Sequence, residues 1–386
     1  MKLSNRTKST LKYLAVALVS SIITFSITLF NFGGSEFWLR FLIKNYYVED
    51  VPQAVINEGA KAGIVASLGD EHSVYIDSEY GFDSFENSLS GEYSGIGAAI
   101  SLVDDKAVIT EIYSNSPAEK AGLMTGDVIT EAAGVRAIGS TISEIAHRLQ
   151  GENGTSVSVK VRRDGKELEF EITREAISVT STSWEKLENN IGYIKLSSFD
   201  FDTDQELVNA LTNLGNSKGI IIDLRDNPGG YMNVAINTID LFVNEGTIVT
   251  AKYKSDETVF SATKENNTSL SDDFLLTTPI CVLVNQNSAS ASEIFSAALK
   301  DHQRATIIGQ NTYGKGSIQS TFSLKNNSGV KLTVGHFYSP NGDKIDGSGV
   351  KPDIEISLAE EYINIPVSTI PRASDLQLKA AINALK

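Results

Sequence analysis

Residues 285–319 constrain the fold of this chain more than any other part of the sequence. They follow an apolar, β-branched run at residues 280–284, which predicts a buried strand. A turn of small residues at 288–293 comes next, and then a segment with apolar side chains at helical spacing. A second short strand at 305–308 leads to Lys315, which lies between two glycines. A serine at a strand-to-helix turn and a lysine from a later loop are one way to build a nucleophile and its base.

Length and charge exclude several classes of protein. The chain has 386 residues, which suggests two or three domains. Its formal net charge of −15 leaves no basic surface for phosphates, so we expect no nucleic-acid partner. The one cysteine, Cys281, lies in an apolar strand and is predicted to be a buried structural thiol. The four histidines show no metal-ligand spacing, so we predict no metal site and no cofactor.

The N-terminal residues predict a membrane anchor. Basic residues precede an uncharged run at residues 13–35 that is rich in Leu, Val, Ile and Phe. About 20 helical residues are enough to cross the hydrocarbon core of a bilayer. Basic residues before the span predict that residues 1–12 are cytoplasmic and that the rest lies outside. We expect an uncleaved signal anchor. A cleaved signal peptide is the alternative, although the run is long and lacks an obvious A-x-A site.

Two further segments are predicted to be helical. Residues 36–90 form a helical arm, because apolar residues between Val55 and Leu68 recur at helical spacing. Residues 359–386 form a linker followed by a short amphipathic helix. The arm and the terminal helix are the candidate contacts of a homodimer.

Residues 91–175 change to short strands separated by turns. Apolar and polar residues alternate on either side of Asp164-Gly165, as in a hairpin, and a helix is predicted near residues 142–149. This order of elements resembles a PDZ domain. The stretch SPAEKAGLMTGDVI at residues 116–129 matches that family's apolar helix and Gly-Asp turn.

The carboxylate-binding loop of the PDZ family falls on four residues here, namely Ser94, Gly95, Ile96 and Gly97. Glycines let successive backbone N–H groups point at one carboxylate. The strand edge that follows can then pair with an extended peptide. A lone GxG is by itself typical of an ordinary turn, so this interpretation depends on the surrounding eighty-odd residues.

Ser290 and Lys315 each have a simpler interpretation. Ser290 and Glu293 fit a capping box at the start of a helix, which is compatible with catalysis because a helix N-terminus also favours an oxyanion. Residues 309–315 spell GxxxxGK, the pattern of a phosphate loop. However, Gly316 supplies no hydroxyl for Mg²⁺, and residues 318–324 alternate like a strand, which argues against nucleotide binding.

The segment around these residues resembles the active site of the carboxyl-terminal processing (tail-specific) serine proteases, the S41-type peptidases. The family's nucleophile is the middle serine of an SASASE-like turn, which falls on Ser290. Its base is the lysine of a [FY]GKG loop, which falls on Lys315, 25 positions later. A supporting glutamine falls on Gln319. If Lys315 is the base, its pKa must lie below its ordinary value of about 10.4.

The resemblance extends from about residue 50 to the C-terminus. The family's LRxNPGG loop matches residues 224–230, and its glycines imply an oxyanion hole of Gly229 or Gly230 with the N–H of Ala291. The departures are small. Tyr313 stands for a frequent Phe, and Glu71-His72 stands where Pro-Tyr is common.

These observations predict a multidomain α+β protein. It would consist of a transmembrane helix, a helical arm, a PDZ domain and, at residues 176–358, an α/β Ser–Lys peptidase core of crotonase/ClpP-like type. The resemblance implies a bacterial, membrane-anchored, extracytoplasmic endopeptidase whose PDZ domain binds free C-termini of protein substrates. A regulatory protein is a further candidate partner.

Three alternatives stay open at this point. A catalytically silent PDZ scaffold and a nucleotide-dependent enzyme built on GxxxxGK are the alternative functions. A Ser–His–Asp triad with His302 or His336 as the base is the alternative mechanism.

Overall fold

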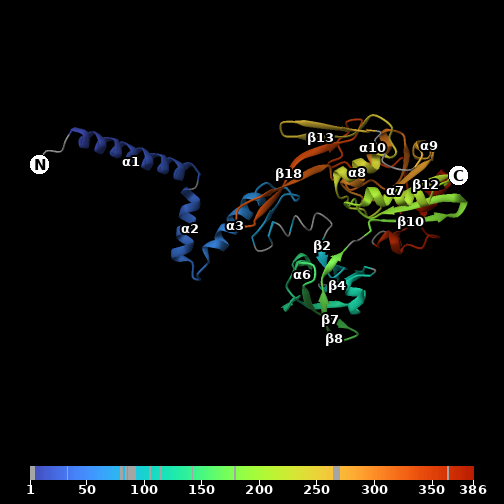
Figure 1. Ribbon diagram of the computed structural model, residues 1–386, viewed down its shortest axis with the longest axis horizontal. Helices are drawn as coiled ribbons and strands as arrows, with labels where there is room; N and C mark the ends of the chain where they lie inside the picture. The colour runs from blue at the N-terminus through green and yellow to red at the C-terminus, as the bar shows by residue number, and fades with distance from the viewer. Residues whose placement is uncertain are drawn as a thin grey trace. The chain divides into compact units, whose positions relative to one another are not determined.

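The computed structural model describes residues 5–32, 34–78, 81–82, 85, 93–103, 106–113, 115–140, 142–177, 180–263, 270–362 and 365–386. The chain divides into two compact units, Met1–Gly69 and Asp70–Lys386. Figure 1 labels several of their helices and strands.

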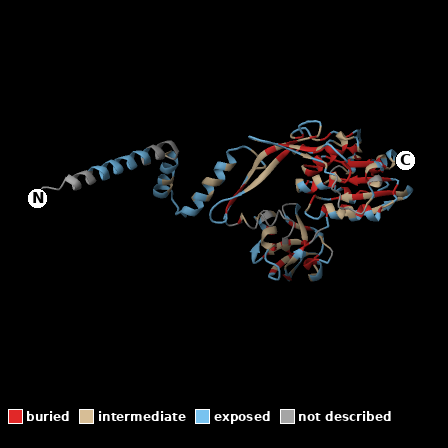
Figure 2. Ribbon diagram, turned by 45° about the horizontal axis from the view of Figure 1, so that its top comes forward, coloured by how far each residue is buried: buried red, intermediate tan, exposed pale blue. Residues whose placement is uncertain are grey.

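The described part of the first unit is helical. It contains α1 (Asn5–Phe32), α2 (Gly34–Tyr46) and α3 (Gln53–Ala66). The helix α3 contains most of the apolar pattern that predicts a helix in the arm. The described residues of α2 and α3 include no buried one, and these helices are pale blue and tan in Figure 2. The predicted arm continues to residue 90, where residues 79–80, 83–84 and 86–90 lie outside the described part.

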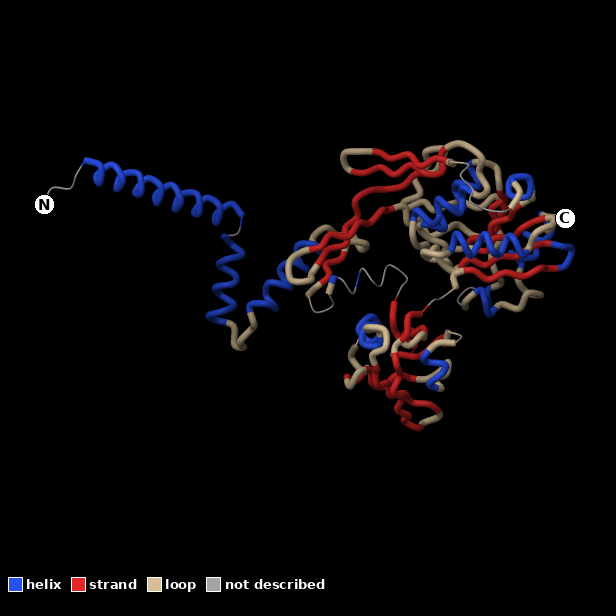
Figure 3. The backbone as a smooth tube through the Cα atoms, viewed as in Figure 1, coloured by secondary structure: helices blue, strands red, loops and turns tan. Residues whose placement is uncertain are grey.

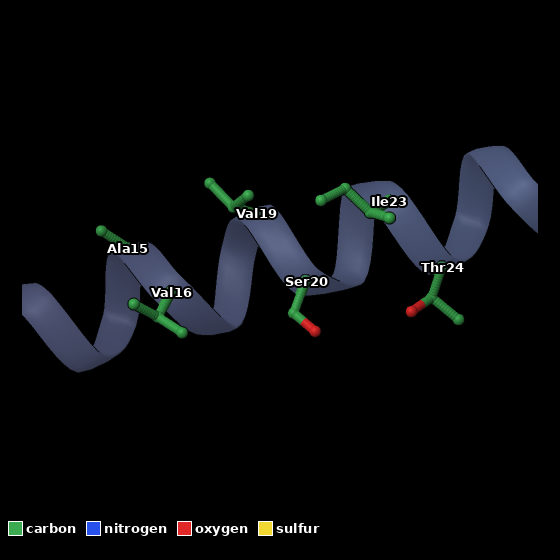
Figure 4. A pocket seen from close by; sticks show the side chains of 6 residues that line it. All are labelled: Ala15, Val16, Val19, Ser20, Ile23 and Thr24. Atoms are coloured by element: carbon green, nitrogen blue, oxygen red, sulfur yellow. The ribbon is translucent and has the colours of Figure 1, made fainter.

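The helix α1 has an open pocket on its own surface. Figure 4 shows the six side chains that line it, which are Ala15, Val16, Val19, Ser20, Ile23 and Thr24. Among the described residues, no helix is long and apolar enough to cross a membrane. The predicted transmembrane helix at residues 13–35 therefore finds no support in the structure. The side chains of residues 25 and 27–33 lie outside its described part.

The predicted PDZ region is a small β-sheet with two helices. The sheet has the order β3-β4-β5-β7-β8, with β6 paired to β5, and β2 pairs with β9. Its elements are β2 (Tyr93–Gly95), β3 (Ala98–Val103), β4 (Lys106–Ile112), α5 (Pro117–Ala121), β5 (Val128–Ala132), β6 (Val135–Arg136), α6 (Ile142–Leu149), β7 (Ser156–Arg163), β8 (Lys166–Thr173) and β9 (Glu175–Ile177). The predicted hairpin is confirmed, because β7 and β8 pair across Asp164-Gly165, and both turn residues have positive φ.

The predicted peptidase region is built on a six-stranded sheet of order β10-β11-β12-β15-β16-β19. All its neighbouring pairs are parallel except β10 with β11. Its strands are β10 (Thr182–Leu187), β11 (Ile191–Leu196), β12 (Gly219–Asp223), β15 (Ile280–Val284), β16 (Ala305–Gly309) and β19 (Ile354–Glu355). The two central strands, β12 and β15, are buried along their whole length, as their apolar runs predict.

Helices cover both faces of this sheet. One face packs against α7 (Thr203–Asn213), α8 (Met232–Asp240) and α10 (Ala291–Asp301), with α9 (Asp272–Thr277) at its edge. The other face packs against α11 (Leu376–Ala384), through side chains such as Ile221, Cys281 and Leu378. Burial raises the pKa of the Cys281 thiol to about 11, which confirms the prediction of a buried cysteine.

The strands of a second, five-stranded sheet are interspersed along the chain with those of the first. Its order is β1-β18-β13-β14, and β17 also pairs with β18. The strands are β1 (Val74–Ile76), β13 (Thr247–Tyr253), β14 (Glu257–Ser261), β17 (Ser317–Ser323) and β18 (Gly329–Tyr338), and Figure 3 draws strands in red. The strand β1 precedes the PDZ region in sequence, yet it pairs with β18 of the peptidase region.

Candidate active site

Ser290 lies at a tight turn between β15 and α10. Its backbone has φ 55° and ψ −114°, a conformation that residues other than glycine rarely adopt. Such a backbone costs on the order of 1–3 kcal/mol and is typical of functional sites. Ala289 and Ala291 on either side are buried. The small residues that the sequence places here are therefore required by packing.

The glycine loop after β12 lies against this turn. Parallel strands β12 and β15 are neighbours, so the loops at their carboxyl ends meet at one edge of the sheet. A Cβ atom on Gly229 would lie 2.7 Å from Ala289 O and 2.9 Å from Ala291 N. A Cβ on Gly230 would lie 2.3 Å from Phe199 O. With φ of 105° and 148°, both positions need glycine.

The three predicted oxyanion-hole donors differ in availability. The Gly229 N–H donates to Asn227 Oδ1 at 2.9 Å. In the described part of the chain, the N–H groups of Gly230 and Ala291 have no acceptor. Gly230 and Ala291 are therefore the pair that is free to bind an oxyanion in this conformation.

A buried charge cluster holds the start of the same loop. The Arg225 guanidinium is 1% exposed and lies 2.6 Å from Asp223 and 2.9 Å from Asp375, the N-cap residue of α11. The Asp223 carboxylate also accepts a hydrogen bond from Tyr193 and lies near Lys195. These partners hold the pKa of Asp223 far below its usual value despite burial, so the cluster is ionised.

Glu293 joins the Ser290 turn to the Lys315 loop. Its carboxylate is fully buried, and its Oε2 accepts the N–H of Ser290 at 2.8 Å and the N–H of Lys315 at 2.9 Å. Its Oε1 accepts the Gly314 N–H at 2.7 Å and the Thr312 hydroxyl at 2.5 Å. Burial raises the pKa of Glu293, and these four hydrogen bonds act against that rise.

The sequence reveals only half of this role. It predicts Glu293 as the partner of Ser290 in a capping box, and the bond from the Ser290 N–H agrees with that. It does not reveal that the same carboxylate binds the backbone of residues 312–315. That contact also argues against a phosphate loop, since the amides of Gly314 and Lys315 are already bound to a carboxylate, and the strand β17 follows.

Lys315 is half-buried, and its surroundings favour the neutral amine. Burial lowers the pKa of its ammonium group, and the nearby positive charge of Lys331 lowers it further. The carboxylates of Glu293 and Glu71 act in the opposite direction. The net pKa is lower than the ordinary value, in the direction that a general base requires.

Gln319 lies on β17, next to a break in the pairing register between Ile318 and Gln319. Its Nε2 donates to Ser317 Oγ at 2.8 Å and to Thr333 Oγ1 at 3.4 Å. Among the described residues, no hydrogen bond joins Gln319 to Lys315. The predicted support of the lysine is therefore not present as a direct contact in this conformation.

Neither alternative base contacts Ser290 through a hydrogen bond in the described part of the chain. His302 follows the last residue of α10, about 18 Å along the helix from Ser290, and its Nε2 lies 2.7 Å from Thr247 O. His336 Nδ1 lies 3.5 Å from Asp346 Oδ2.

The PDZ region contains a small cavity where the sequence predicts a carboxylate-binding loop. It has a volume of about 110 Å³ and is lined by Gly95, Ile96, Gly97, Ala98, Ile100, Ile142, Ala146, Leu149 and Gln150. The fourth predicted residue, Ser94, does not line it, and Ser94 O accepts the Gly151 N–H at 3.1 Å. The cavity is thus apolar except for backbone groups and one amide side chain.

Comparison with known proteins assigns both regions. Residues 190–356 match the model of peptidase family S41, and residues 94–173 match that of the PDZ domain. The carboxy-terminal processing protease CtpA of Bacillus subtilis is 33% identical over 381 residues, which cover 93% of this chain and 80% of the relative. The carboxy-terminal-processing protease of Bartonella bacilliformis is 34% identical over 330 residues, covering 83% of this chain and 74% of the relative.

A solved structure shows the same architecture. The photosystem II D1 C-terminal processing protease superposes with a TM-score of 0.53 and 26% identity, covering 83% of this chain and 86% of the other. The two family models, the sequence relatives and the similar fold all indicate the same family. The chain therefore belongs to the carboxy-terminal processing serine proteases of peptidase family S41.

Proposed function

We propose that this chain is a membrane-anchored endopeptidase that cleaves peptide bonds with a Ser290–Lys315 dyad and recognises substrate C-termini through its PDZ domain. The observation that carries the dyad is the Glu293 carboxylate. One of its oxygen atoms lies within 2.9 Å of the backbone nitrogens of both Ser290 and Lys315. Residues 25 positions apart are thereby held side by side by a buried group.

The proposed reaction follows from these groups. Lys315 Nζ, as a neutral amine, takes the proton of the Ser290 hydroxyl while Oγ attacks the carbonyl carbon of the peptide. The N–H groups of Gly230 and Ala291 bind the oxyanion of the tetrahedral intermediate. The intermediate collapses, the C–N bond breaks, and Lys315 gives its proton to the leaving amine. Water then hydrolyses the acyl-enzyme by the same sequence of proton transfers.

The PDZ cavity supports the proposed substrate class. Its apolar lining accepts an apolar C-terminal side chain. In the described chain, the N–H groups of Ile96 and Gly97 have no acceptor, and a terminal carboxylate can bind there. Proteins and peptides with free, apolar C-termini are therefore the proposed partners.

The proposed membrane anchor depends on the N-terminal sequence. The uncharged run at residues 13–35, preceded by basic residues, supports an extracytoplasmic peptidase held at the plasma membrane. Extraction of membranes with alkaline carbonate tests this, since an anchored chain stays in the pellet.

The exposed aromatic side chains of α2, such as Phe37 and Trp38, support a homodimer contact in the arm. A regulatory partner is proposed from the family resemblance alone.

The test of the dyad uses the full chain in detergent and an unfolded protein substrate with an apolar C-terminus. We expect Ser290→Ala and Lys315→Ala to fold and to lose activity by about 10³-fold or more. Lys325→Ala, in an exposed turn, is the matched control. Normal cleavage by Lys315→Ala would contradict the proposed base. Peptide binding without any cleavage by the wild type would favour the silent scaffold.

A further inference from the structure

A short segment upstream of the PDZ region reaches the sheet that carries Gln319. We call residues 70–76 the strap. Its strand β1 pairs antiparallel with β18, with Val74 opposite Lys331. The strand β17 pairs with the same strand, with Gln319 opposite Thr333. The strap is therefore separated from Gln319 by one strand.

Hydrogen bonds to the backbone and to the side chain of Thr333 join the strap to Gln319. The Ser73 hydroxyl donates to Asp70 Oδ2 at 2.5 Å, and the Thr333 N–H donates to Ser73 Oγ at 3.0 Å. Gln319 Nε2 donates to Thr333 Oγ1 at 3.4 Å. Hydrogen bonds from the side chains of Ser73 and Thr333 lower the pKa of Asp70 to about 2. Asp70 is thus a permanent acceptor at the end of the chain of bonds.

These bonds fix the orientation of the Gln319 amide. Its NH₂ group has two donors, and both are used, one by Ser317 and one by Thr333. The amide oxygen then remains as the acceptor. An acceptor is what the N–H groups of a lysine side chain need, whether the amine is neutral or charged. The break in register at Ile318 and Gln319 adds a means of directing the side chain.

The strap also influences Lys315 by charge. The Glu71 carboxylate, next to Asp70, raises the pKa of Lys315, and Lys331, opposite Val74, lowers it. Glu293 on α10 is the third charged group that acts on Lys315. Two of the three charges therefore come from the strap and from the strand with which it pairs.

We propose that Asp70, Ser73 and Thr333 form a positioning relay, which holds the Gln319 amide ready to accept a hydrogen bond from Lys315. The relay makes a segment outside the S41-matched region part of the peptidase site. In the described residues, none of its three members has a hydrogen bond to Ser290 or Lys315, so each is proposed to act through Gln319. This inference rests on the proposed Ser290–Lys315 dyad.

The experiment measures kcat and KM of the full chain on one peptide substrate. We expect Ser73→Ala and Thr333→Val to lower kcat about tenfold and to leave KM unchanged, because the base is misplaced while substrate binding is not. Ser73→Thr and Thr333→Ser keep the hydroxyls and should keep most of the activity. Ser320→Ala removes a hydroxyl of β17 that is not in the relay, and it should behave as the wild type.

A double-mutant cycle separates positioning from a general loss of stability. In a Gln319→Ala background, Ser73→Ala should cause no further loss of kcat, because the relay has lost its target. Additive losses would overturn the proposal and show that Ser73 acts elsewhere. If the relay variants match Ser320→Ala while Ser290→Ala is inert, the relay is wrong and the dyad stands. If Ser290→Ala cleaves normally, the proposed function itself fails.

Discussion

The glycine loop of the PDZ region and the glycine-flanked loop that contains Lys315 use their backbone amides in opposite ways. In the PDZ region, Ile96 and Gly97 line the cavity, and in the described chain their N–H groups have no acceptor. In the loop that delivers Lys315, the amides of Gly314 and Lys315 bind the chain's own carboxylate, Glu293. Both loops are glycine-rich in sequence. The comparison teaches that the amides of such a loop are available to an external anion only where no internal carboxylate accepts their hydrogen bonds.

The largest expected effect comes from removing that internal carboxylate. Glu293→Gln keeps the size of the side chain. Its NH₂ group, however, faces either the N–H groups of Ser290 and Lys315 or the Gly314 N–H and the Thr312 hydroxyl. We expect cleavage to fall by about 10²–10³-fold, as for other losses of site organisation. Leaving buried donors unpaired should also lower the unfolding free energy by about 1–3 kcal/mol. Steady-state kinetics and thermal unfolding measure both.

The control for this variant is peptide binding. Glu293 lies outside the PDZ cavity, so Glu293→Gln should bind a C-terminal peptide as the wild type does. A loss of peptide binding equal to the loss of cleavage would mean that the variant is globally misfolded.

The next effect compares one glycine from each region. Gly230→Ala places a Cβ 2.3 Å from Phe199 O and should lower kcat by about 10²-fold, because it displaces a proposed oxyanion donor. Gly97→Ala places a Cβ 2.4 Å from Ser116 Cβ at the PDZ cavity. It should weaken binding of a C-terminal peptide and leave cleavage of a short peptide intact. Calorimetric titration and kinetics of both variants would reveal a reversed pattern if the assignments are wrong.

The smallest effect is a shift in pH dependence. Activity should rise with pH as Lys315 loses its proton, and Glu71 opposes that loss by raising the pKa of Lys315. Glu71→Gln should therefore move the acidic limb of the kcat/KM profile to lower pH, with Lys331 and Glu293 still acting on the lysine. The Glu71 side chain is 77% exposed, so salt should reduce the shift.

The matched control for the pH profile is Glu257→Gln on β14, which removes an exposed carboxylate that does not act on Lys315. A shift of the acidic limb to higher pH in Glu71→Gln would contradict the sign of the interaction.

Much of the fold could be predicted because it follows from local patterns. Apolar runs predict β12 and β15, and alternation predicts the β7–β8 hairpin, since burial and side-chain period are properties of adjacent residues. The strand β1 could not be predicted in the same way. Its residues fall within the predicted helical arm, and their partner in β18 lies more than 250 positions later.

In the candidate site, too, some features could be predicted from local sequence patterns and others could not. Ser290, Lys315, Gly229 and Gly230 are found from motifs, because each needs a particular residue type at one position. The transmembrane helix is also predicted from composition alone, and the described residues give it no support. The direct contact expected between Gln319 and Lys315 depends on the path of β17, and this conformation does not contain it.

The sequence by itself determined the family, the order of the PDZ and peptidase regions, and the residue types of the proposed dyad. The tertiary structure decided which backbone donors are free, which carboxylate joins Ser290 to Lys315, and which distant segment reaches Gln319. The physical reason is that a hydrogen bond depends on atoms brought within about 3 Å. For Glu293 and the Lys315 loop, and for Ser73 and Thr333, only the folded chain brings those atoms together.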